Sequence, residues 1–514
     1  MDDSSQSENL RKLQAEVKAQ LLLLHHPVLV ENQTELMDLG TAHWRLTIEF
    51  GKLIFTAWNS GKSISRRVEE YAYRDHDRFG VFVRKPGARE TSTLEFRELH
   101  AAASVGRTAG RLGFRQQFAA MLEREYRGWK FQYVSNRSDR EYSFSAWYTR
   151  GMASQGRSSW AFFGLSEDEG AAAADNVLAF GLIWLDWLRS RAECTTIGTL
   201  KLYLPSAAVS LIAHRAAYFN PKVLNVEIYE WRAGQASPTL VELKDYGNVE
   251  TRLAVRRQAE LLKDTHTNIL REMLGDLSEG IAMVPDPNAA YTSLRIAGLE
   301  VGRIEGQLAP RIDFGLEGSF RRLDGTSPED FRNFLREVTR IRCANTPDAR
   351  HEFYRLQSER WLESLVFKDI TRIDPSLSPE HVYSQVPAFS GTDRGIIDLL
   401  TTTRGGRLAV IELKVHEEIN LPLQGLDYWL RVNWLESRNQ FQEFGYFQGC
   451  ELSPGPPLLY LVSPAFRFHS TTEKLLRYFN PQIEVFLVGI NDSWRNGIQV
   501  LFHRRIPRRN NSSQ

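Results

Sequence analysis

Two carboxylates and one amine stand in a short stretch of the chain where their side chains could share one site. Residues 394–414 read RGIIDLLTTTRGGRLAVIELK. Two apolar runs flank a turn around Arg404 to Gly406, which is typical of a β-hairpin. Asp398 interrupts the first run, and Glu412 and Lys414 interrupt the second. Residues two apart on a strand share a face, so Glu412 and Lys414 should project together, with Asp398 opposite Glu412 to within a residue.

This cluster of charge on apolar strands admits two interpretations. Burying carboxylates and an amine costs several kcal/mol unless they are paired or bind a metal, which favours a metal site. In the competing interpretation, Glu412 and Lys414 lie on a solvated edge strand, where lysine blocks aggregation, and Asp398 is a surface residue. The runs GIIDLL and LAVIELKV are more apolar than a typical edge strand, so we expect a site that does chemistry.

The composition is that of an ordinary soluble protein. A chain of 514 residues is long enough for two to four domains with ample core. The net charge of +1 argues against a partner chosen by bulk positive charge, although a local basic patch can still bind nucleic acid. The run LLLLHHPVLV is too short to span a bilayer, so we expect no membrane association.

The cysteines and the N-terminus predict a cytoplasmic protein. Cys194, Cys343 and Cys450 are far apart, and no pair of them has metal-ligand spacing. A small, odd number of widely separated cysteines is typical of a protein whose thiols are reduced. The first residues, MDDSSQSEN, are acidic and polar, unlike a signal peptide.

The chain is expected to contain four segments. Residues 1–110 form a small N-terminal α+β segment, in which 65–73 are predicted to be helical. Residues 111–250 form an α/β domain, and 251–345 form a helical and β connector that begins with a long polar helix. Residues 346–509 form a second α/β domain, which carries the hairpin.

The two α/β segments share an order of elements and some short words. Each reads as helix, three strands, long helix, strand, helix and strand. Tyr218-Phe219-Asn220-Pro221 recurs at residues 478–481, and each copy follows a strand that contains Leu-Tyr-Leu. This predicts an internal duplication of about 140 residues, with two unrelated α/β layers as the alternative.

Residues 350–490 resemble the PD-(D/E)XK, or restriction-endonuclease-like, nuclease superfamily. The resemblance rests on an ordered set, Glu363 on a helix, Asp398 on a strand, Glu412-Leu413-Lys414 on the next strand and Gln424 on the following helix. It implies a multidomain α/β protein with a restriction-endonuclease-like αβββαβ core at its C-terminus. The duplication then implies a degenerate copy of that core in the N-terminal half.

The resemblance implies a set of metal ligands. Asp398, Glu412 and the backbone carbonyl of Leu413 would hold Mg²⁺, or Mn²⁺, which prefers hard oxygen ligands and keeps several waters. Glu363 would hold a ligating water or a second metal. Glu359 lies one helical turn earlier on the same face and is the alternative for this role.

The remaining motif residues would act on the attacking water and the phosphate. Lys414 would orient or help deprotonate the water, and a cation beside it should lower its pKa. Gln424 would steady the lysine or a phosphate oxygen. Ile397 precedes the aspartate where the superfamily pattern has proline, a position that varies among its members.

The first copy is expected to lack this chemistry. We align FFGL (162–165) with IELK and YSFSAW (142–147) with GIIDLL, and neither offers Asp or Glu-x-Lys. The resemblance therefore implies one metal-dependent endonuclease domain that acts on nucleic acid, with DNA as the leading substrate. The alternatives are a non-catalytic nucleic-acid-binding or partner scaffold, or a ribonuclease. Cutting both strands requires two active sites, which a homodimer would supply, or two events.

Overall fold

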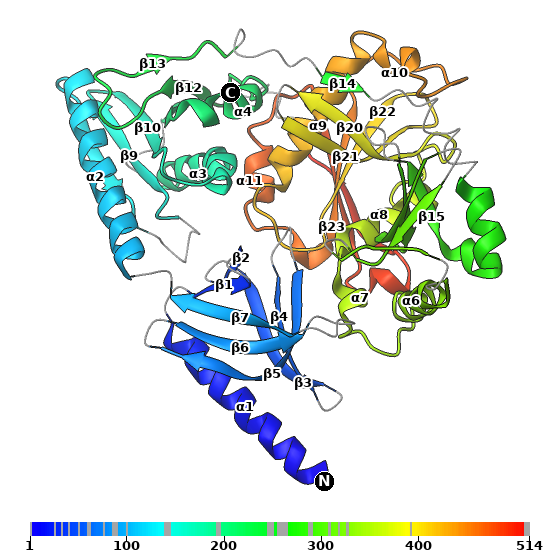
Figure 1. Cartoon of the computed structure of the whole chain (residues 1–514). Helices are drawn as coiled ribbons and strands as arrows, with labels where there is room; N and C mark the ends of the chain where they lie inside the picture. The colour runs from blue at the N-terminus through cyan, green and yellow to red at the C-terminus, as the bar shows by residue number, and fades with distance from the viewer. Residues whose placement is uncertain are drawn as a thin grey trace. The chain divides into compact units, whose positions relative to one another are not determined.

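The computed structural model describes most of the chain and divides it into two compact units, residues 1–114 and 115–514. The described residues are 3–24, 27–31, 34–39, 42–49, 52–58, 63–75, 78–84, 91–98, 101–137, 145–191, 197–243, 251–253, 266–285, 291–306, 310–316, 319–324, 328–390 and 393–507. They form four β-sheets with helices packed against them (Figure 1). The fold is therefore a mixed α/β arrangement of several sheets, as the sequence predicts. No helix among these residues has both the length and the apolar character that crossing a bilayer requires.

The first unit is an antiparallel sheet of seven strands in the order β2-β1-β7-β6-β5-β4-β3. The strands are β1 (Pro27–Glu31), β2 (Thr34–Asp38), β3 (His43–Glu49), β4 (Lys52–Trp58), β5 (Ser63–Arg74), β6 (Arg78–Arg84) and β7 (Thr91–Glu98). Helix α1 (Asp3–Leu23) covers one face, and its Val17 and Leu21 join the core around Phe55 and Phe96. Burial of apolar side chains between α1 and the sheet holds this unit together.

The helix predicted at residues 65–73 is wrong, because these residues lie in strand β5. The pairing of β5 with β6 shifts register twice, between Val68 and Glu70 and between Tyr71 and Tyr73. Each irregularity interrupts the alternation of inward and outward side chains that marks a strand in sequence. The resulting spacing of apolar residues is similar to that of a helix. Strand β5 forms nevertheless, because it pairs with β4 on one side and β6 on the other.

The first lobe, defined here as residues 130–240, contains a six-stranded sheet in the order β13-β12-β11-β10-β9-β8. Its elements are β8 (Lys130–Ser135), β9 (Tyr148–Gln155), β10 (Ser158–Leu165), α3 (Ala171–Arg189), β11 (Thr199–Leu204), α4 (Ser206–Ala216), β12 (Asn225–Glu230) and β13 (Thr239–Leu240), and α2 (Ala101–Glu125) precedes them. Strand β9 begins at Tyr148, after residues 142–147, which the sequence aligns with the strand GIIDLL. Residues 142–144 lie outside the described part of the chain, and 146–147 form a turn.

The second lobe, defined as residues 358–505, contains a seven-stranded sheet in the order β14-β20-β21-β22-β23-β24-β25. Its elements are α8 (Ser358–Lys368), β20 (Tyr383–Ser390), β21 (Asp393–Thr402), β22 (Leu408–Leu413), α9 (Leu421–Glu436), α10 (Gln440–Glu443), β23 (Leu458–Pro464), α11 (Thr472–Leu476), β24 (Glu484–Ile490) and β25 (Val500–Arg505). Strand β14 (Thr251–Leu253) joins the edge of this sheet beside β20.

The two lobes have the same topology. In each, the first three strands pair antiparallel, the third, fourth and fifth pair parallel, and the sixth pairs antiparallel with the fifth. Each parallel pair is joined by a helix, α3 or α9 for the first connection and α4 or α11 for the second. The order of elements that the sequence predicts for both segments is present in the structure.

A connector lies between the lobes in sequence. It contains a helix at residues 266–274 and an antiparallel sheet of β15 (Ala282–Pro285), β16 (Tyr291–Ile296), β17 (Leu299–Glu305), β18 (Arg311–Phe314) and β19 (Arg321–Arg322), followed by α6 (Pro328–Ile341) and α7 (Glu352–Arg355). The predicted long helix at 251–274 is wrong at its start, where β14 is a strand, and residues 254–265 lie outside the described part.

The tip of the β16–β17 hairpin packs closely against the backbone of helix α8. Gly298 has φ +79°, and a Cβ there would lie 2.1 Å from the carbonyl oxygen of Arg360. Only glycine combines this left-handed backbone with so close an approach. The buried Arg342 donates from its Nη2 to the carbonyl of Ala297 at 2.6 Å, and so ties α6 to the same tip. The connector thereby fixes the helix that carries Glu363.

Candidate functional site

The β21–β22 hairpin brings Asp398 and Glu412 together. Leu399 pairs with Ile411 and Leu400 with Val410, and the same register continued by one residue sets Asp398 opposite Glu412. This register is the one that the sequence predicts. Strand β22 pairs with β21 on one side and β23 on the other, so it is not an edge strand. The interpretation of Glu412 and Lys414 as a solvated edge pair is therefore wrong.

Glu412 is a buried carboxylate with an unused oxygen. It is 1% exposed, and its Oε1 lies 3.3 Å from the Lys414 Nζ. Its Oε2 is buried and has no hydrogen-bond partner among the residues that the structure describes. Burial, and then the charge of Asp398, raise the pKa of Glu412 well above its ordinary value, although Lys414 opposes them. Such a group favours an additional positive charge beside it.

Lys414 lies between two carboxylates. Its Nζ is 3.4 Å from the Glu359 Oε2 on α8, as well as close to Glu412. Burial alone would lower the pKa of Lys414, but Glu412, Glu359 and Asp398 together raise it. The protein groups therefore hold the lysine as an ammonium ion. A divalent cation at the same carboxylates would repel that charge and move the pKa in the opposite direction.

Asp398 is held in place by its neighbours. Its Oδ2 accepts a hydrogen bond of 3.0 Å from the Leu413 backbone N–H, and its Oδ1 lies 3.7 Å from the Arg360 Nη1. The aspartate is 18% exposed in its side chain, so solvent still reaches it. Asp398 is thus fixed on the strand opposite Glu412, from which it raises the pKa of that carboxylate.

Glu363 lies deeper than the sequence indicates. It is 5% exposed, and its Oε2 accepts hydrogen bonds from the Arg360 Nη1 at 2.8 Å and the Gln385 Nε2 at 2.7 Å. Gln385 falls opposite Asp398 in the β20–β21 register and has φ +54°, a left-handed backbone that costs energy in a non-glycine residue. Its side-chain bond to Glu363 helps to hold that conformation beside the site.

Helix α9 packs against β21 and β22 and carries two polar residues, Gln424 and Tyr428. Gln424, on its first turn, has a buried Oε1 without a hydrogen-bond partner among the described residues. Tyr428 lies one turn later and is mostly buried. Burial, and then the charges of Glu412 and Asp398, raise the pKa of its hydroxyl, which places the tyrosine within the same electrostatic environment. Tyr428 should therefore stay protonated and able to donate a hydrogen bond.

Sequence reasoning missed Arg360, Gln385 and Tyr428. Arg360 is three residues before Glu363 on a helix, and Tyr428 is four residues after Gln424, so helical spacing could have found both. Gln385 lies on a different strand, and no local pattern marks it. Arg295, on β16 of the connector, is a further charged residue near Glu363 and Arg360. Burial, and then the charge of Arg360, lower the pKa of Arg295.

The burial of Glu363 predicts a pH-dependent stability. Burial is the main cause that raises the pKa of Glu363 from 4.5 to about 8, against the pull of Arg360. The folded state therefore holds this proton more tightly than the unfolded chain. The resulting stability is complete below pH 4.5 and is lost as the pH rises through about 8. We expect the free energy of unfolding of the wild type to fall by a few kcal/mol across this window relative to Glu363→Gln.

Urea denaturation at a series of pH values measures this difference. Glu380→Gln, at an exposed position of the same lobe, is the matched control and should follow the wild type. Parallel profiles for the wild type and Glu363→Gln would contradict the prediction.

The strand pairing corrects the alignment of the two lobes. Gly164 pairs with Tyr203, and Ile411 pairs with Tyr460, each tyrosine being the centre of a Leu-Tyr-Leu word. IELK therefore corresponds to residues 164–167, GLSE, and not to FFGL at 162–165. Leu165 takes the place of Glu412.

The same register gives the other two equivalences. Leu165 pairs with Tyr148, so Tyr148 corresponds to Asp398, which the sequence alignment had matched to residues 142–147. Glu167, two residues after Leu165, corresponds to Lys414. At all three positions the first lobe therefore lacks the side chain that the second lobe carries.

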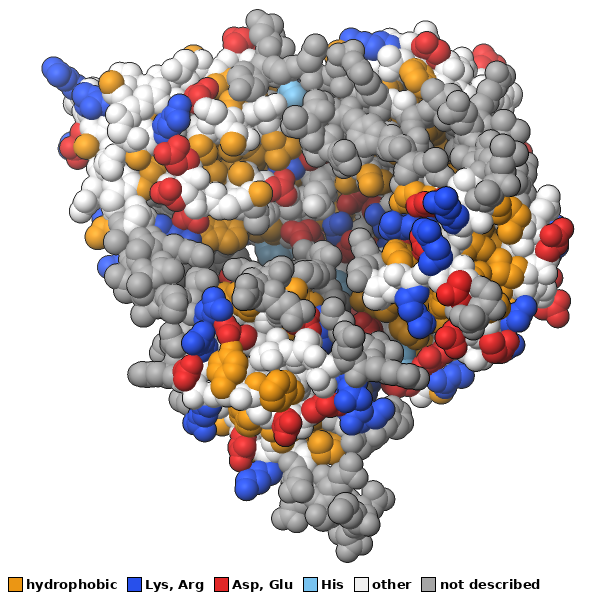
Figure 2. All heavy atoms as spheres, in the orientation of Figure 1, with side chains coloured by type: hydrophobic (Ala, Val, Ile, Leu, Met, Phe, Trp, Pro, Cys, Tyr) orange, Lys and Arg blue, Asp and Glu red, His pale blue; other side chains and the backbone are white. Residues whose placement is uncertain are grey.

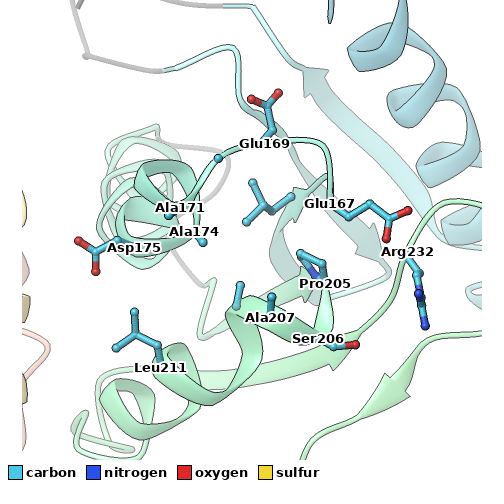
Figure 3. A pocket seen from close by; sticks show the side chains of 13 residues that line it. Glu167, Glu169, Ala171, Ala174, Asp175, Pro205, Ser206, Ala207, Leu211 and Arg232 are labelled. Carbon is cyan, nitrogen blue, oxygen red and sulfur yellow. The ribbon is translucent and has the colours of Figure 1, made fainter. Parts of the chain in front are cut away.

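The first lobe has a hollow of about 560 Å³ at this equivalent position (Figure 3). It lies where β10 and β11 end and where α3 and α4 begin. Leu165 lines it together with Glu167, Glu169, Asp175 and Arg232. Glu167, which stands in place of Lys414, makes the hollow a poor setting for a phosphate, because like charges repel. The hollow therefore lies at the position equivalent to the candidate site of the second lobe but lacks the side chains of that site.

The second lobe can be tested as a metal site on its donor atoms. Within the described residues, no three His, Cys, Asp or Glu side chains are grouped closely enough to hold a metal ion by themselves. Mg²⁺ does not require three, because it commonly binds through one or two carboxylates and several waters. Asp398 and Glu412 supply two, and the Glu412 Oε2 has no other described partner. These residues fit Mg²⁺ or Mn²⁺.

No protein-family model and no curated protein matches the sequence.

Proposed function

We propose that the protein is a metal-dependent nuclease that hydrolyses phosphodiester bonds, with DNA as its substrate. One observation carries the proposal. The buried Glu412, with an unused carboxylate oxygen, lies opposite Asp398 and beside the buried Lys414. A soluble protein rarely keeps such a group inside without a use for its charge. The succession α8, β20, β21, β22, α9, β23 supports the restriction-endonuclease-like core that the motif implies.

In this proposal, Asp398, Glu412 and the Leu413 carbonyl hold the cation. Mg²⁺ or Mn²⁺, when bound, neutralises phosphoryl charge and makes a bound water more acidic. The hydrogen bond from the Leu413 N–H fixes Asp398 on the strand opposite Glu412, so this carboxylate would already be oriented when a cation binds. Preorganisation of this kind lowers the cost of assembling the site during the reaction.

Lys414 orients the attacking water and accepts or shares its proton. The lysine is anchored by Glu412 and Glu359, so its Nζ has little freedom. A cation held by those carboxylates would oppose their effect on Lys414 and lower the pKa of the lysine, so more of it would be present as the neutral amine, the form that can accept a proton. Gln424 and Tyr428 on α9 would hydrogen-bond the lysine or a phosphate oxygen.

Two carboxylates on α8 compete for the supporting role. Glu363 is engaged by Arg360 and Gln385, whereas the Glu359 Oε1 has no described hydrogen-bond partner. Glu363 would hold a ligating water through this network. Glu359 would anchor Lys414 and share that water.

The surface is compatible with a local nucleic-acid contact. On the face drawn in Figure 2, the described Lys and Arg side chains lie in small groups among acidic and apolar ones. Together with the net charge of +1, this favours binding near the site over a broad electrostatic surface. DNA is proposed because the superfamily that the motif resembles mostly acts on it. A nucleic-acid-binding scaffold or a ribonuclease are the alternatives.

The experiment uses purified full-length protein with plasmid, linear duplex DNA, single-stranded DNA and RNA, each with Mg²⁺ or with EDTA. We expect Mg²⁺-dependent cleavage of DNA that EDTA abolishes. Tight binding without cleavage would favour the scaffold, and cleavage of RNA alone would favour the ribonuclease. Cleavage that persists in EDTA would contradict a metal-dependent site.

A further inference from the structure

The two lobes contact one another through the repeated tetrapeptide. The Asn220 N–H donates to the Tyr478 carbonyl at 2.8 Å, and the Asn480 N–H donates to the Tyr218 carbonyl at 2.9 Å. Between these two bonds, Phe219 and Phe479 form an antiparallel bridge, with ring centroids 6.1 Å apart. Each copy of the tetrapeptide thus makes the same hydrogen bond to the other copy. Such reciprocity is the mark of a two-fold interface.

The helices repeat this reciprocity. Helix α3 contacts α11, and α4 contacts α9, which are equivalent pairs under exchange of the lobes. One continuous apolar core crosses the contact and includes Leu182 and Ile212 from the first lobe and Leu426 and Leu430 from the second. Apolar continuity of this kind is typical of permanent interfaces.

A buried polar network also joins the lobes beside the candidate site. Arg215 on α4 is 1% exposed and donates from its Nε to the Asp427 Oδ1 of α9 at 2.9 Å, and from its Nη2 to the Asp175 Oδ1 of α3 at 2.6 Å. Asn420, at the N-cap of α9, donates to the Asp175 Oδ2 at 2.6 Å. The first lobe therefore holds the start of the helix that carries Gln424.

The two lobes form a pseudo-symmetric pair, and only the second lobe carries the proposed catalytic side chains. Tyr148, Leu165 and Glu167 stand in the first lobe where Asp398, Glu412 and Lys414 stand in the second. The face through which a second lobe could pair with another copy is already covered by the first lobe. Glu167, in place of Lys414, disfavours a phosphate at the hollow of the first lobe (Figure 3).

From these contacts we infer that the chain is a built-in pseudo-dimer with a single active site, and that it cuts one strand of duplex DNA in each binding event. This rests on the proposed function and specifies its product. The first lobe acts as the inactive half, which completes the interface and positions α9. Cutting both strands then requires two independent events, so the primary product is a nick.

Supercoiled plasmid with full-length protein and Mg²⁺ tests the inference in a time course resolved on an agarose gel. We expect open circles as the early product, with linear DNA appearing only after most of the supercoiled form has been consumed. Linear DNA formed from the start in proportion to the loss of supercoiled plasmid would overturn the inference and leave the proposed function standing. Absence of any cleavage that depends on Lys414 would overturn both.

A mixing experiment separates a single chain from a homodimer. Wild type is combined with increasing Lys414→Met protein while total protein stays constant. If each chain acts alone, the nicking rate should follow the amount of wild type in direct proportion, so a 1:1 mixture nicks two-fold more slowly. A steeper loss would show that two chains cooperate in the cut, and would overturn the inference.

Discussion

Replacing Lys414 by methionine should lower the rate of metal-dependent cleavage by a factor of about 10² to 10⁴, the range expected when a group that transfers a proton is lost. Methionine keeps much of the length of the side chain and fills the same space. It removes the ammonium that lies 3.3 Å from Glu412 and 3.4 Å from Glu359. Cleavage of a labelled duplex under single-turnover conditions measures the effect.

Two further variants sharpen this test. Lys368→Met removes an exposed lysine at the end of α8 and should leave the rate unchanged. Lys414→Arg keeps a positive charge but cannot release its proton near neutral pH, so it should be nearly as slow as Lys414→Met if proton transfer matters. An arginine variant with close to wild-type activity would assign Lys414 a purely electrostatic role. A fully active Lys414→Met would place the chemistry elsewhere.

Replacing Glu412 by glutamine should change activity and stability in opposite directions. The side chain is 1% exposed, and its ionised form is disfavoured by burial and by Asp398. A neutral isostere removes that penalty while Glu359 still pairs with Lys414, and we expect a gain of about 1 kcal/mol in the free energy of unfolding. Removal of a cation ligand should reduce cleavage by about 100-fold or more, since even changes around a metal site's ligands cost about 10–100-fold.

Thermal unfolding with and without Mg²⁺ gives a measurement that does not depend on activity. Mg²⁺ should raise the unfolding midpoint of the wild type, because a ligand that binds the folded state stabilises it, and should raise that of Glu412→Gln much less. Glu380→Gln, exposed in the same lobe, should respond as the wild type does. Equal Mg²⁺ stabilisation of the wild type and Glu412→Gln would exclude Glu412 as a ligand.

Much of the candidate site could be predicted because it is local in sequence. The hairpin is short, its turn fixes the pairing of β21 with β22, and alternation fixes which residues share a face. Asp398, Glu412 and Lys414 therefore follow from a single stretch. The order of elements in the two lobes was also predictable, because long apolar helices and strands have distinct periods.

The predictions that failed concern elements whose local pattern conflicts with their surroundings. Strand β5 reads as a helix because two register irregularities disturb its alternation. The single helix expected at the start of the second α/β segment is divided into α7 and α8, and Gln357, with φ +45°, lies at the break. The segment matched to IELK on β22 was wrong by two residues. Which residues of the two lobes are equivalent depends on how β10 and β22 pair with the next strand, and the sequence does not show this pairing.

The sequence by itself determined the hairpin, its three charged side chains and the repeated words in the two lobes. Only the tertiary structure decided that Gln385 and Arg360 hold Glu363, that Glu359 reaches Lys414, and that the repeated tetrapeptides bind each other. The physical reason is that periodicity shows which face of an element is buried, whereas the groups that cover that face come from distant parts of the chain.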